Sequence, residues 1–181
     1  MIRALLSQVL LAGMLAGMPV TAAEARRIPT PAGGPDVHTV LDVGRPLEPG
    51  DYVWDDDGAP AGPTHVVVDT ERRQLYVYRG GVEIGRSFAV SGPPEMPTPL
   101  GRFPILEKDA DKYSRSYDAP MPYSLRLTRS YVAIHGSKVE WDWVTHGCIG
   151  VPLPFARILF RNVRVGDDVL VTRHWLPAAY D

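Results

Sequence analysis

The residues best suited to chemistry lie in the stretch Thr145-His146-Gly147-Cys148-Ile149-Gly150. Cys148 is the only cysteine of the chain, and His135 ends an apolar run upstream of it. A thiolate is the working nucleophile of cysteine chemistry, and an adjacent imidazole lowers the pKa of a thiol and later returns the proton. Because Gly147 has no side chain, the N–H groups of Gly147 and Cys148 can point at an oxyanion. These residues therefore favour acyl transfer through a thioester.

Two other interpretations of the same residues remain open. His135, His146 and Cys148 are also ligand types that suit zinc, with His174 or an aspartate as a fourth. A single His-x-Cys pair is a weak zinc signal, since structural zinc sites usually show two closely spaced ligand pairs. The other interpretation is an inert thiol, because a lone cysteine is commonly a small buried hydrophobe.

The N-terminus predicts export. Arg3 is followed by an almost wholly apolar run over residues 4–20, and then by the small residues Thr21-Ala22-Ala23. This pattern is typical of a secretory signal peptide over residues 1–23. The alternative is an uncleaved membrane anchor, although the run is close to the shortest that spans a bilayer.

Export limits the possible roles of the lone cysteine, and the distribution of charge limits the possible partners of the protein. Because an exported chain with one cysteine forms no internal disulfide, Cys148 is either inert or a reactive thiol. The formal net charge is −2, and the basic residues are scattered along the chain. This distribution argues against a nucleic-acid groove and against a cationic membrane-binding face.

Composition divides the exported part into three segments. Residues 24–62 are rich in proline and glycine and predict a linker, with a flexible first half and Leu47 to Trp54 packed along the domain surface. Residues 63–173 form the expected domain. Residues 174–181 form a C-terminal tail.

The domain begins with a pattern typical of antiparallel strands. Thr64 to Asp69 is a β-branched run, Gln74 to Tyr78 alternates, and Val82 to Ser91 makes a third strand. Residues 70–73 suit a hairpin loop, and Arg79-Gly80-Gly81 suits a turn with positive φ. The sequence therefore predicts a meander at the start of a mainly β domain.

The rest of the domain predicts further strands and a helix. Residues 92–101 hold four prolines and predict an ordered loop rather than a strand. Residues 107–120 are polar and predict irregular structure. A helix is expected from Pro154 to Asn162, with Phe155, Ile158 and Leu159 on one face. Extended segments are expected at Arg102–Leu106, Met121–Thr128, Ser130–Ile134 and Val169–Thr172.

The two histidine-containing segments together resemble a known family. Ile134-His135-Gly136-Ser137, followed by Thr145-His146-Gly147-Cys148-Ile149, resembles the signature of the L,D-transpeptidase catalytic domain. Residues 66–92 look like the family's opening strands, and Thr98 to Ile105 resembles its "TP-x-G-x-F-x-I" stretch. Residues 119–128 look like the segment before its catalytic strand. The resemblance covers about residues 63–173.

The resemblance implies a fold and an activity. The fold is mainly β, an L,D-transpeptidase-like β-sandwich with one or two short helices. The activity is that of an exported peptidoglycan L,D-transpeptidase in the periplasm or cell envelope, acting as a monomer without metal or organic cofactor. Its cysteine forms a thioester with a tetrapeptide stem and releases D-alanine. The acyl group then passes to an amine of a second stem or of a lipoprotein.

The resemblance also assigns roles to residues of this chain. Cys148 is the nucleophile, His135 the general base and acid, and the Gly136 carbonyl orients the His135 ring. His146 shapes the site without being the main base, and Tyr123 contributes to the oxyanion site.

Three further side chains allow either a functional or a packing role. Arg126 meets a substrate carboxylate or is a structural strand residue. Trp141 and Trp143 form a substrate wall or pack against the domain.

Gly150 departs from the family pattern, which commonly has Arg or Asn two positions after the cysteine. This departure leaves two alternatives beside the transpeptidase. One is an L,D-carboxypeptidase or cross-link hydrolase, with water as the acceptor. The other is a catalytically silent peptidoglycan-binding module.

Overall fold

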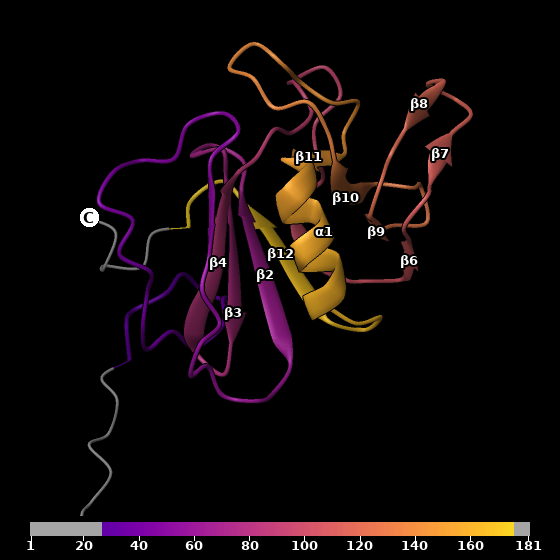
Figure 1. Cartoon of the computed structure of the whole chain (residues 1–181). Helices are drawn as coiled ribbons and strands as arrows, with labels where there is room; N and C mark the ends of the chain where they lie inside the picture. The colour runs from indigo at the N-terminus through magenta and orange to yellow at the C-terminus, as the bar shows by residue number, and fades with distance from the viewer. Residues whose placement is uncertain (1–26, 176–181) are drawn as a thin grey trace, which may run out of the picture.

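The computed structural model describes residues 27–175 of the chain (Figure 1). The expected signal peptide and most of the expected C-terminal tail lie outside these residues. Within them, no helix is long and apolar enough to cross a membrane.

The larger of two main sheets has six strands in the order β1-β4-β3-β2-β12-β5. The neighbouring strands β2 and β12 are parallel, with Val66 opposite Val169, and every other pair is antiparallel. The strands alternate side chains between the two faces of the sheet. Their bounds are β1 Tyr52–Trp54, β2 Thr64–Asp69, β3 Gln74–Arg79, β4 Val82–Phe88, β5 Gly101–Pro104 and β12 Asp168–Thr172.

The smaller sheet has four strands in the order β11-β10-β9-β6, and it carries the candidate chemistry. Strands β10 and β11 are parallel, so the chain leaves one, crosses a loop, and returns beside it. Two further short strands form a hairpin that projects from this side of the molecule (Figure 1). Their bounds are β6 Glu107–Asp109, β9 Ser124–Arg126, β10 Ala133–Gly136 and β11 Ile149–Val151, with β7 Tyr113–Ser114 and β8 Ala119–Pro120 in the hairpin.

The helix α1 (Leu153–Asn162) lies between the two sheets and joins them through one core (Figure 1). Pro154 occupies its first turn, where a missing N–H costs nothing. Phe155 and Leu159 are fully buried against residues of both sheets, including Val66 and Ile134. Because the helix packs against both sheets, it fixes the position of β10 and β11 relative to the large sheet.

The opposite face of the large sheet is covered by residues from both ends of the described chain. Tyr76 and Tyr78 point to this face and pack with Val37 and Trp175, which are both fully buried. The Trp175 indole N–H donates to the Tyr78 hydroxyl at 2.9 Å. The described part of segment 24–62 is therefore packed along the domain, including the stretch Leu47 to Trp54 that was expected to do so, and β1 pairs with β4 at its edge.

Most strand positions agree with the sequence patterns. Strand β2 has the predicted bounds, the 70–73 hairpin loop is present, and Gly80 and Gly81 both take positive φ. The mainly β fold is therefore confirmed, with one short helix in the described residues.

Three details differ from the expectations. The 107–120 segment contains β6, β7 and β8 instead of being irregular throughout. Ala156 rather than Ile158 completes the buried face of α1. The first half of segment 24–62 is not a spacer in its described part, because Val37 is buried and its carbonyl accepts from the Ile28 N–H at 2.7 Å.

Candidate active site

Strand β10 delivers His135 to the site in a defined tautomer. The side chain is 8 % exposed, and its Nδ1 lies 2.9 Å from the carbonyl oxygen of Gly136. Because a carbonyl only accepts, Nδ1 carries the proton and Nε2 is left as an acceptor. A side chain at Gly136 would meet Leu153 and Pro122, so the glycine permits this close packing. The expected orienting contact from Gly136 is thus present.

Cys148 precedes β11, and its backbone is held firmly. Its carbonyl oxygen accepts from the Thr145 hydroxyl at 2.5 Å and from the Thr98 hydroxyl at 3.4 Å. Thr98 Oγ1 in turn accepts from the Gly92 N–H at 2.9 Å. The proline-rich loop of residues 92–101 is therefore an ordered support for the cysteine, and Thr98 is a supporting residue that spacing alone did not reveal.

Burial sets the protonation of both catalytic candidates. It lowers the pKa of His135 below its ordinary 6.5, although the hydrogen bond to Gly136 opposes the shift. Burial raises the pKa of the Cys148 thiol above its ordinary 9.0, although hydrogen bonding to the Ala133 backbone opposes that shift. Both effects favour the neutral forms. The expectation that an imidazole lowers the thiol pKa is therefore wrong for this state of the site, where the thiol donates to the Tyr131 carbonyl at 3.8 Å.

Two cavities meet at Cys148. The first, called the His135 cavity, has a volume of about 620 Å³ and is also lined by Lys138, Trp143 and Leu153. The second, called the Arg126 cavity, has a volume of about 690 Å³. Five residues line both: Ser114, Tyr117, Met121, His146 and Cys148.

His146 lies at the junction of the two cavities. Its ring stacks on Tyr117 of the β7–β8 hairpin, with centroids 4.4 Å apart and planes at 19°. The expected role of His146, shaping the site without being its main base, stays a prediction. No local signal in the sequence points to Tyr117, because the contact depends on how the hairpin folds over the motif.

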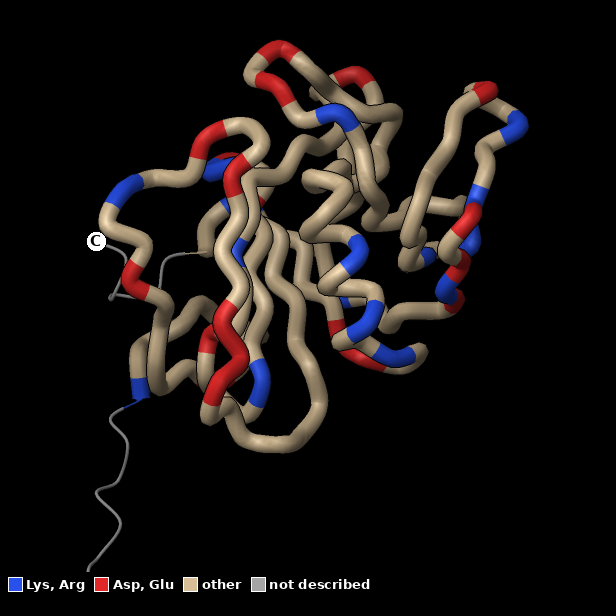
Figure 2. The backbone as a smooth tube through the Cα atoms, viewed as in Figure 1, with Lys and Arg blue, Asp and Glu red and all other residues tan. Residues whose placement is uncertain are grey.

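The Arg126 cavity carries charges of both signs. Acidic and basic residues alternate along the segment from β6 to β8, as Figure 2 shows. Arg126 lines the cavity, and its Nε donates to Glu107 at 2.8 Å. Lys112 also lines it and lies 3.9 Å from the same carboxylate. The structure thus places Arg126 at the site but already paired with an acid.

Tyr123 lies apart from the other expected site residues. It packs against the core, with its ring edge-on to Phe160 at a centroid distance of 5.7 Å, and it lines neither cavity. The geometry therefore gives no support to an oxyanion role for Tyr123. Gly147 takes a φ of +97°, a conformation that glycine adopts readily, and it remains the candidate partner of Cys148 in such a site.

Close packing around position 150 explains why this residue is a glycine. Gly150 pairs with His135 across β10 and β11 and exchanges two backbone hydrogen bonds with Val90, both 2.9 Å long. A Cβ at this position would lie 2.7 Å from Val90 Cγ2 and 2.8 Å from Ser137 Cβ. The space that a side chain would need is therefore already filled.

The zinc interpretation finds no support in the arrangement of the described residues. Within residues 27–175, no three histidine, cysteine or carboxylate side chains are grouped to hold a metal ion. His174, the suggested fourth ligand, lies 3.3 Å from the Glu71 carboxylate instead.

The comparisons with known proteins agree with this geometry. Residues 63–171 match the L,D-transpeptidase catalytic domain family, YkuD. A curated relative, the probable L,D-transpeptidase 3 of Mycobacterium tuberculosis, is 29 % identical over 136 residues, which cover 64 % of this chain and 47 % of that protein.

Solved structures give the same result. An L,D-transpeptidase of Mycobacterium tuberculosis H37Rv superposes with a TM-score of 0.57 at 26 % identity, covering 61 % of this chain and 58 % of that one. L,D-transpeptidase 3 of Mycobacterium tuberculosis, solved with a faropenem-derived adduct, has a TM-score of 0.56 at 25 % identity and 61 % coverage of each chain.

The chain belongs to the L,D-transpeptidase catalytic domain family. It spans about half the length of the curated relative that it matches. The shared part is the domain that contains His135 and Cys148.

Proposed function

We propose that this protein is an exported peptidoglycan L,D-transpeptidase that uses Cys148 as its nucleophile and His135 as its general base and acid. The observation that carries the proposal is the pairing of β10 with β11, which brings the buried, Nδ1-protonated His135 beside the segment that bears Cys148. Membership of the family supplies the substrate class, the stem peptides of peptidoglycan.

The first half-reaction forms a thioester. His135 Nε2 takes the proton from Cys148 as the sulfur attacks the carbonyl carbon of the diaminopimelate residue in a tetrapeptide stem. The N–H groups of Gly147 and Cys148 stabilise the oxyanion, a contribution of about 2.7–4 kcal/mol for each donor in comparable sites. The C–N bond to D-alanine then breaks, and His135 returns the proton to the departing amine.

The second half-reaction transfers the acyl group. An amine of a second stem loses a proton to His135 and attacks the thioester carbonyl. The C–S bond breaks, the sulfur regains the proton, and a new amide joins the two stems. Bound stems that fill the two cavities displace water and so strengthen the interactions that stabilise the transition state.

The two cavities favour a stem as the acceptor over water. Each has a volume above 600 Å³, and both open onto Cys148. A site used only for hydrolysis needs one peptide cavity and access for water. An amine of a lipoprotein is a second acceptor with the same chemistry.

A product assay tests the proposal. The protein is incubated with a D-Ala-terminated tetrapeptide donor and a second stem, and the products are identified by mass spectrometry. We expect a 3–3 cross-linked dimer and released D-alanine, with neither formed by Cys148→Ala.

The other outcomes separate the alternatives. Release of D-alanine without a dimer identifies a carboxypeptidase, and cleavage of a preformed dimer identifies a cross-link hydrolase. Binding of stem peptides without any product identifies a silent binding module.

A further inference from the structure

Arg73 ends the hairpin loop between β2 and β3 and reaches across to the loop that joins His135 to the cysteine motif. Its Nη1 donates to the Trp141 carbonyl at 2.6 Å, and its Nη2 donates to the carbonyls of Glu140 and Trp143 at 2.9 and 3.3 Å. One guanidinium thus binds three carbonyl oxygens within four residues of the loop. The planar, multiply donating guanidinium suits this task, which a lysine ammonium cannot reproduce.

The Arg73 side chain is itself fixed between two aromatic rings. Its guanidinium carbon lies 4.9 Å from the Phe88 ring centroid and 5.5 Å from that of Trp141. The two rings meet edge-on at 5.1 Å. The contact therefore joins β4 of the large sheet to the tip of the loop.

The backbone of Arg73 is held in an unusual conformation. Its φ is +55°, a region that non-glycine residues adopt at a cost of about 1–2 kcal/mol. Its carbonyl accepts from the Ala89 N–H at 2.8 Å, and Asp69 caps the start of the same turn through the Glu71 and Arg72 N–H groups. A glycine would relieve the strain but would lose every contact to the loop.

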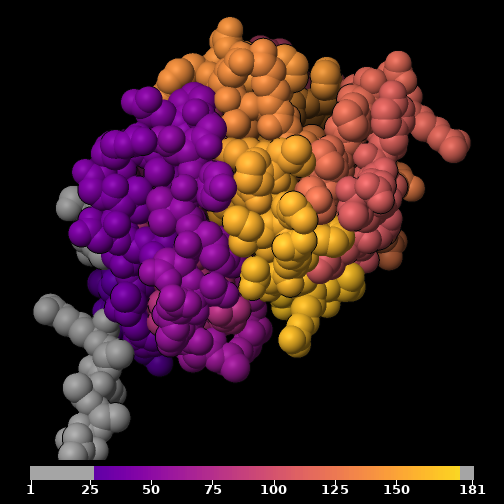
Figure 3. All heavy atoms as spheres, in the orientation of Figure 1, coloured from indigo at the N-terminus to yellow at the C-terminus, as the bar shows by residue number. Residues whose placement is uncertain are grey.

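The loop held by Arg73, residues 137–147, forms one wall of the site. Lys138 and Trp143 line the His135 cavity, and Thr145 holds the Cys148 carbonyl. In the space-filling view the orange atoms, which include this loop, lie at the top of the molecule and border the purple residues of the segment before β2 (Figure 3). Val139 provides a second attachment by packing against Leu47, Phe88 and Val90.

We propose that Arg73 is a positioning residue for the acyl-transfer reaction. It fixes the 137–147 loop, and so holds the wall of the His135 cavity and the Cys148 motif in the positions that the reaction requires. The inference rests on the proposed function and adds to it a residue on the large sheet. Loss of the guanidinium removes three hydrogen bonds from residues 140–143 of the loop and leaves this stretch attached through the packing of Val139 and of the Trp141 ring on Phe88.

The test uses Arg73→Ala, with Arg79→Ala as the matched control. Arg79 lies at the other end of β3 and pairs with Asp56 at 3.2 Å, far along the strand from the loop. We expect Arg73→Ala to lower the acylation efficiency with the tetrapeptide donor by about 10- to 100-fold, because small displacements of a positioned group have effects of this size. Alkylation of Cys148 by iodoacetamide, which needs no cavity wall, should change less than about twofold.

Two readouts separate positioning from a general loss of folding. Millimolar guanidinium should restore part of the Arg73→Ala acylation rate, while equal sodium should not. Hydrogen exchange should accelerate at residues 137–147 in Arg73→Ala and not in Arg79→Ala. Equal acylation by wild type and Arg73→Ala, or equal losses in acylation, alkylation and melting temperature, would overturn the inference.

The exchange measurement also keeps the two proposals distinguishable. If wild-type protein leaves the donor unchanged, the proposed function fails. Local exchange in the 137–147 loop then still decides whether Arg73 anchors it, and unchanged exchange refutes the anchoring.

Discussion

The sulfur of Cys148 and the ring of His135 both occupy a setting that disfavours charge. An ion pair of thiolate and imidazolium would have to be formed inside the buried site, against the desolvation of both groups. Under the proposed function, the proton therefore passes from the thiol to His135 as the sulfur attacks the substrate carbonyl. This account makes His135 a base that must be neutral before the substrate arrives.

The pH dependence of acylation follows from the lowered pKa of His135. His135 is an effective base only when neutral, and its pKa is lowered, so the acid limb of the rate against pH should lie below pH 6.5. We expect His135→Gln to lower the rate by about 10²- to 10⁴-fold and to abolish this limb. The measurement is the rate of carbapenem acylation across pH. An acid limb above pH 6.5 would contradict the account.

Gly150 is also a residue-scale feature, and packing accounts for it. Gly150→Ala should lower the free energy of unfolding by about 1–3 kcal/mol, because the added Cβ overlaps Val90 and Ser137. Thermal and denaturant unfolding measure the change. The double variant with Ser137→Gly should recover part of the loss, since it removes one of the two close contacts. Full stability of Gly150→Ala would show that the position has room.

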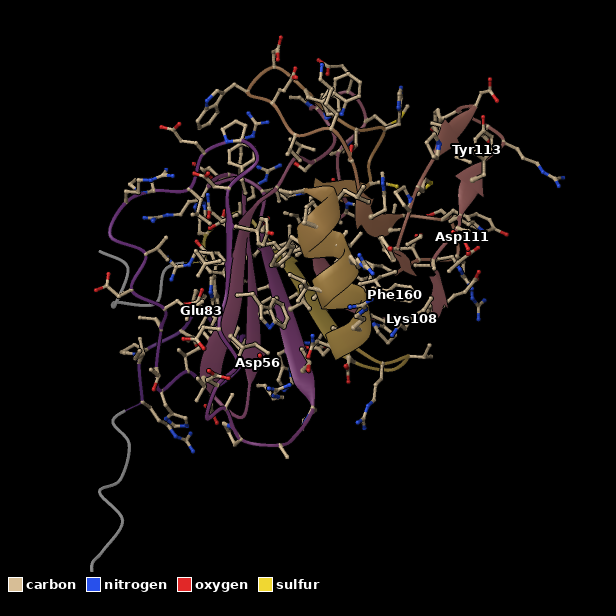
Figure 4. All side chains as sticks on the ribbon, in the orientation of Figure 1. Asp56, Glu83, Lys108, Asp111, Tyr113 and Phe160 are labelled. Carbon is tan, nitrogen blue, oxygen red and sulfur yellow. The ribbon has the colours of Figure 1, made fainter. Side chains whose placement is uncertain are left out.

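At the scale of elements, α1 depends on a lysine from the small sheet. Lys108 of β6 donates to the carbonyls of Phe160 and Val163 at 2.6 and 2.5 Å, and its ammonium lies 4.5 Å from the Phe160 ring centroid. Figure 4 shows Lys108 and Phe160 side by side at the end of the helix. A cation at a helix C-terminus satisfies carbonyls that have no partner within the helix and complements the helix dipole.

Lys108→Met should therefore destabilise the fold by about 1–3 kcal/mol, the range for hydrogen bonds to a charged group. Lys138→Met is the matched control, because Lys138 is exposed and its ammonium lies at the surface, 2.8 Å from Glu140 and 5.0 Å from the Trp143 ring centroid. Chemical denaturation of both variants gives the comparison. Equal stability of the two would show that the helix cap contributes nothing.

The elements that the sequence predicted well are those specified by local patterns. The β-branched run of β2 and the glycines before β4 determine their structure within a few residues, and Pro154 marks the helix start. The motif also placed His135 and Cys148 in one candidate site, and both residues line the His135 cavity. Arg73 and Tyr117 carry no such signal, because their partners lie far away in sequence. The thiol pKa was missed for the same reason, since burial is a tertiary property.

At the scale of the whole molecule, residues outside the family match complete the fold. Trp175 is fully buried on the outer face of the large sheet, where its backbone N–H donates to the buried carboxylate of Asp69 at 2.7 Å. The turn around Gly34 packs directly on its ring. The chain segments before and after the catalytic domain thus cover a sheet face that is otherwise apolar.

Truncating this contact should affect the stability of the whole domain. Trp175→Ala should lower the free energy of unfolding by about 3–5 kcal/mol, as for other buried aromatic residues. Trp141→Ala is the control, because Trp141 is 62 % exposed. The two are compared by denaturant unfolding, and a smaller loss for Trp175 than for Trp141 would show that the outer cover is dispensable.

The most direct test of the central claim is the site of the acyl group on the enzyme. Wild-type protein is mixed with the tetrapeptide donor or a carbapenem, and the adduct is located by intact-mass measurement and peptide mapping. The account predicts one acyl group, less D-alanine for the donor, on the peptide that contains Cys148, and none on a folded Cys148→Ala protein. An adduct on another residue, or an undiminished reaction of Cys148→Ala, would contradict it.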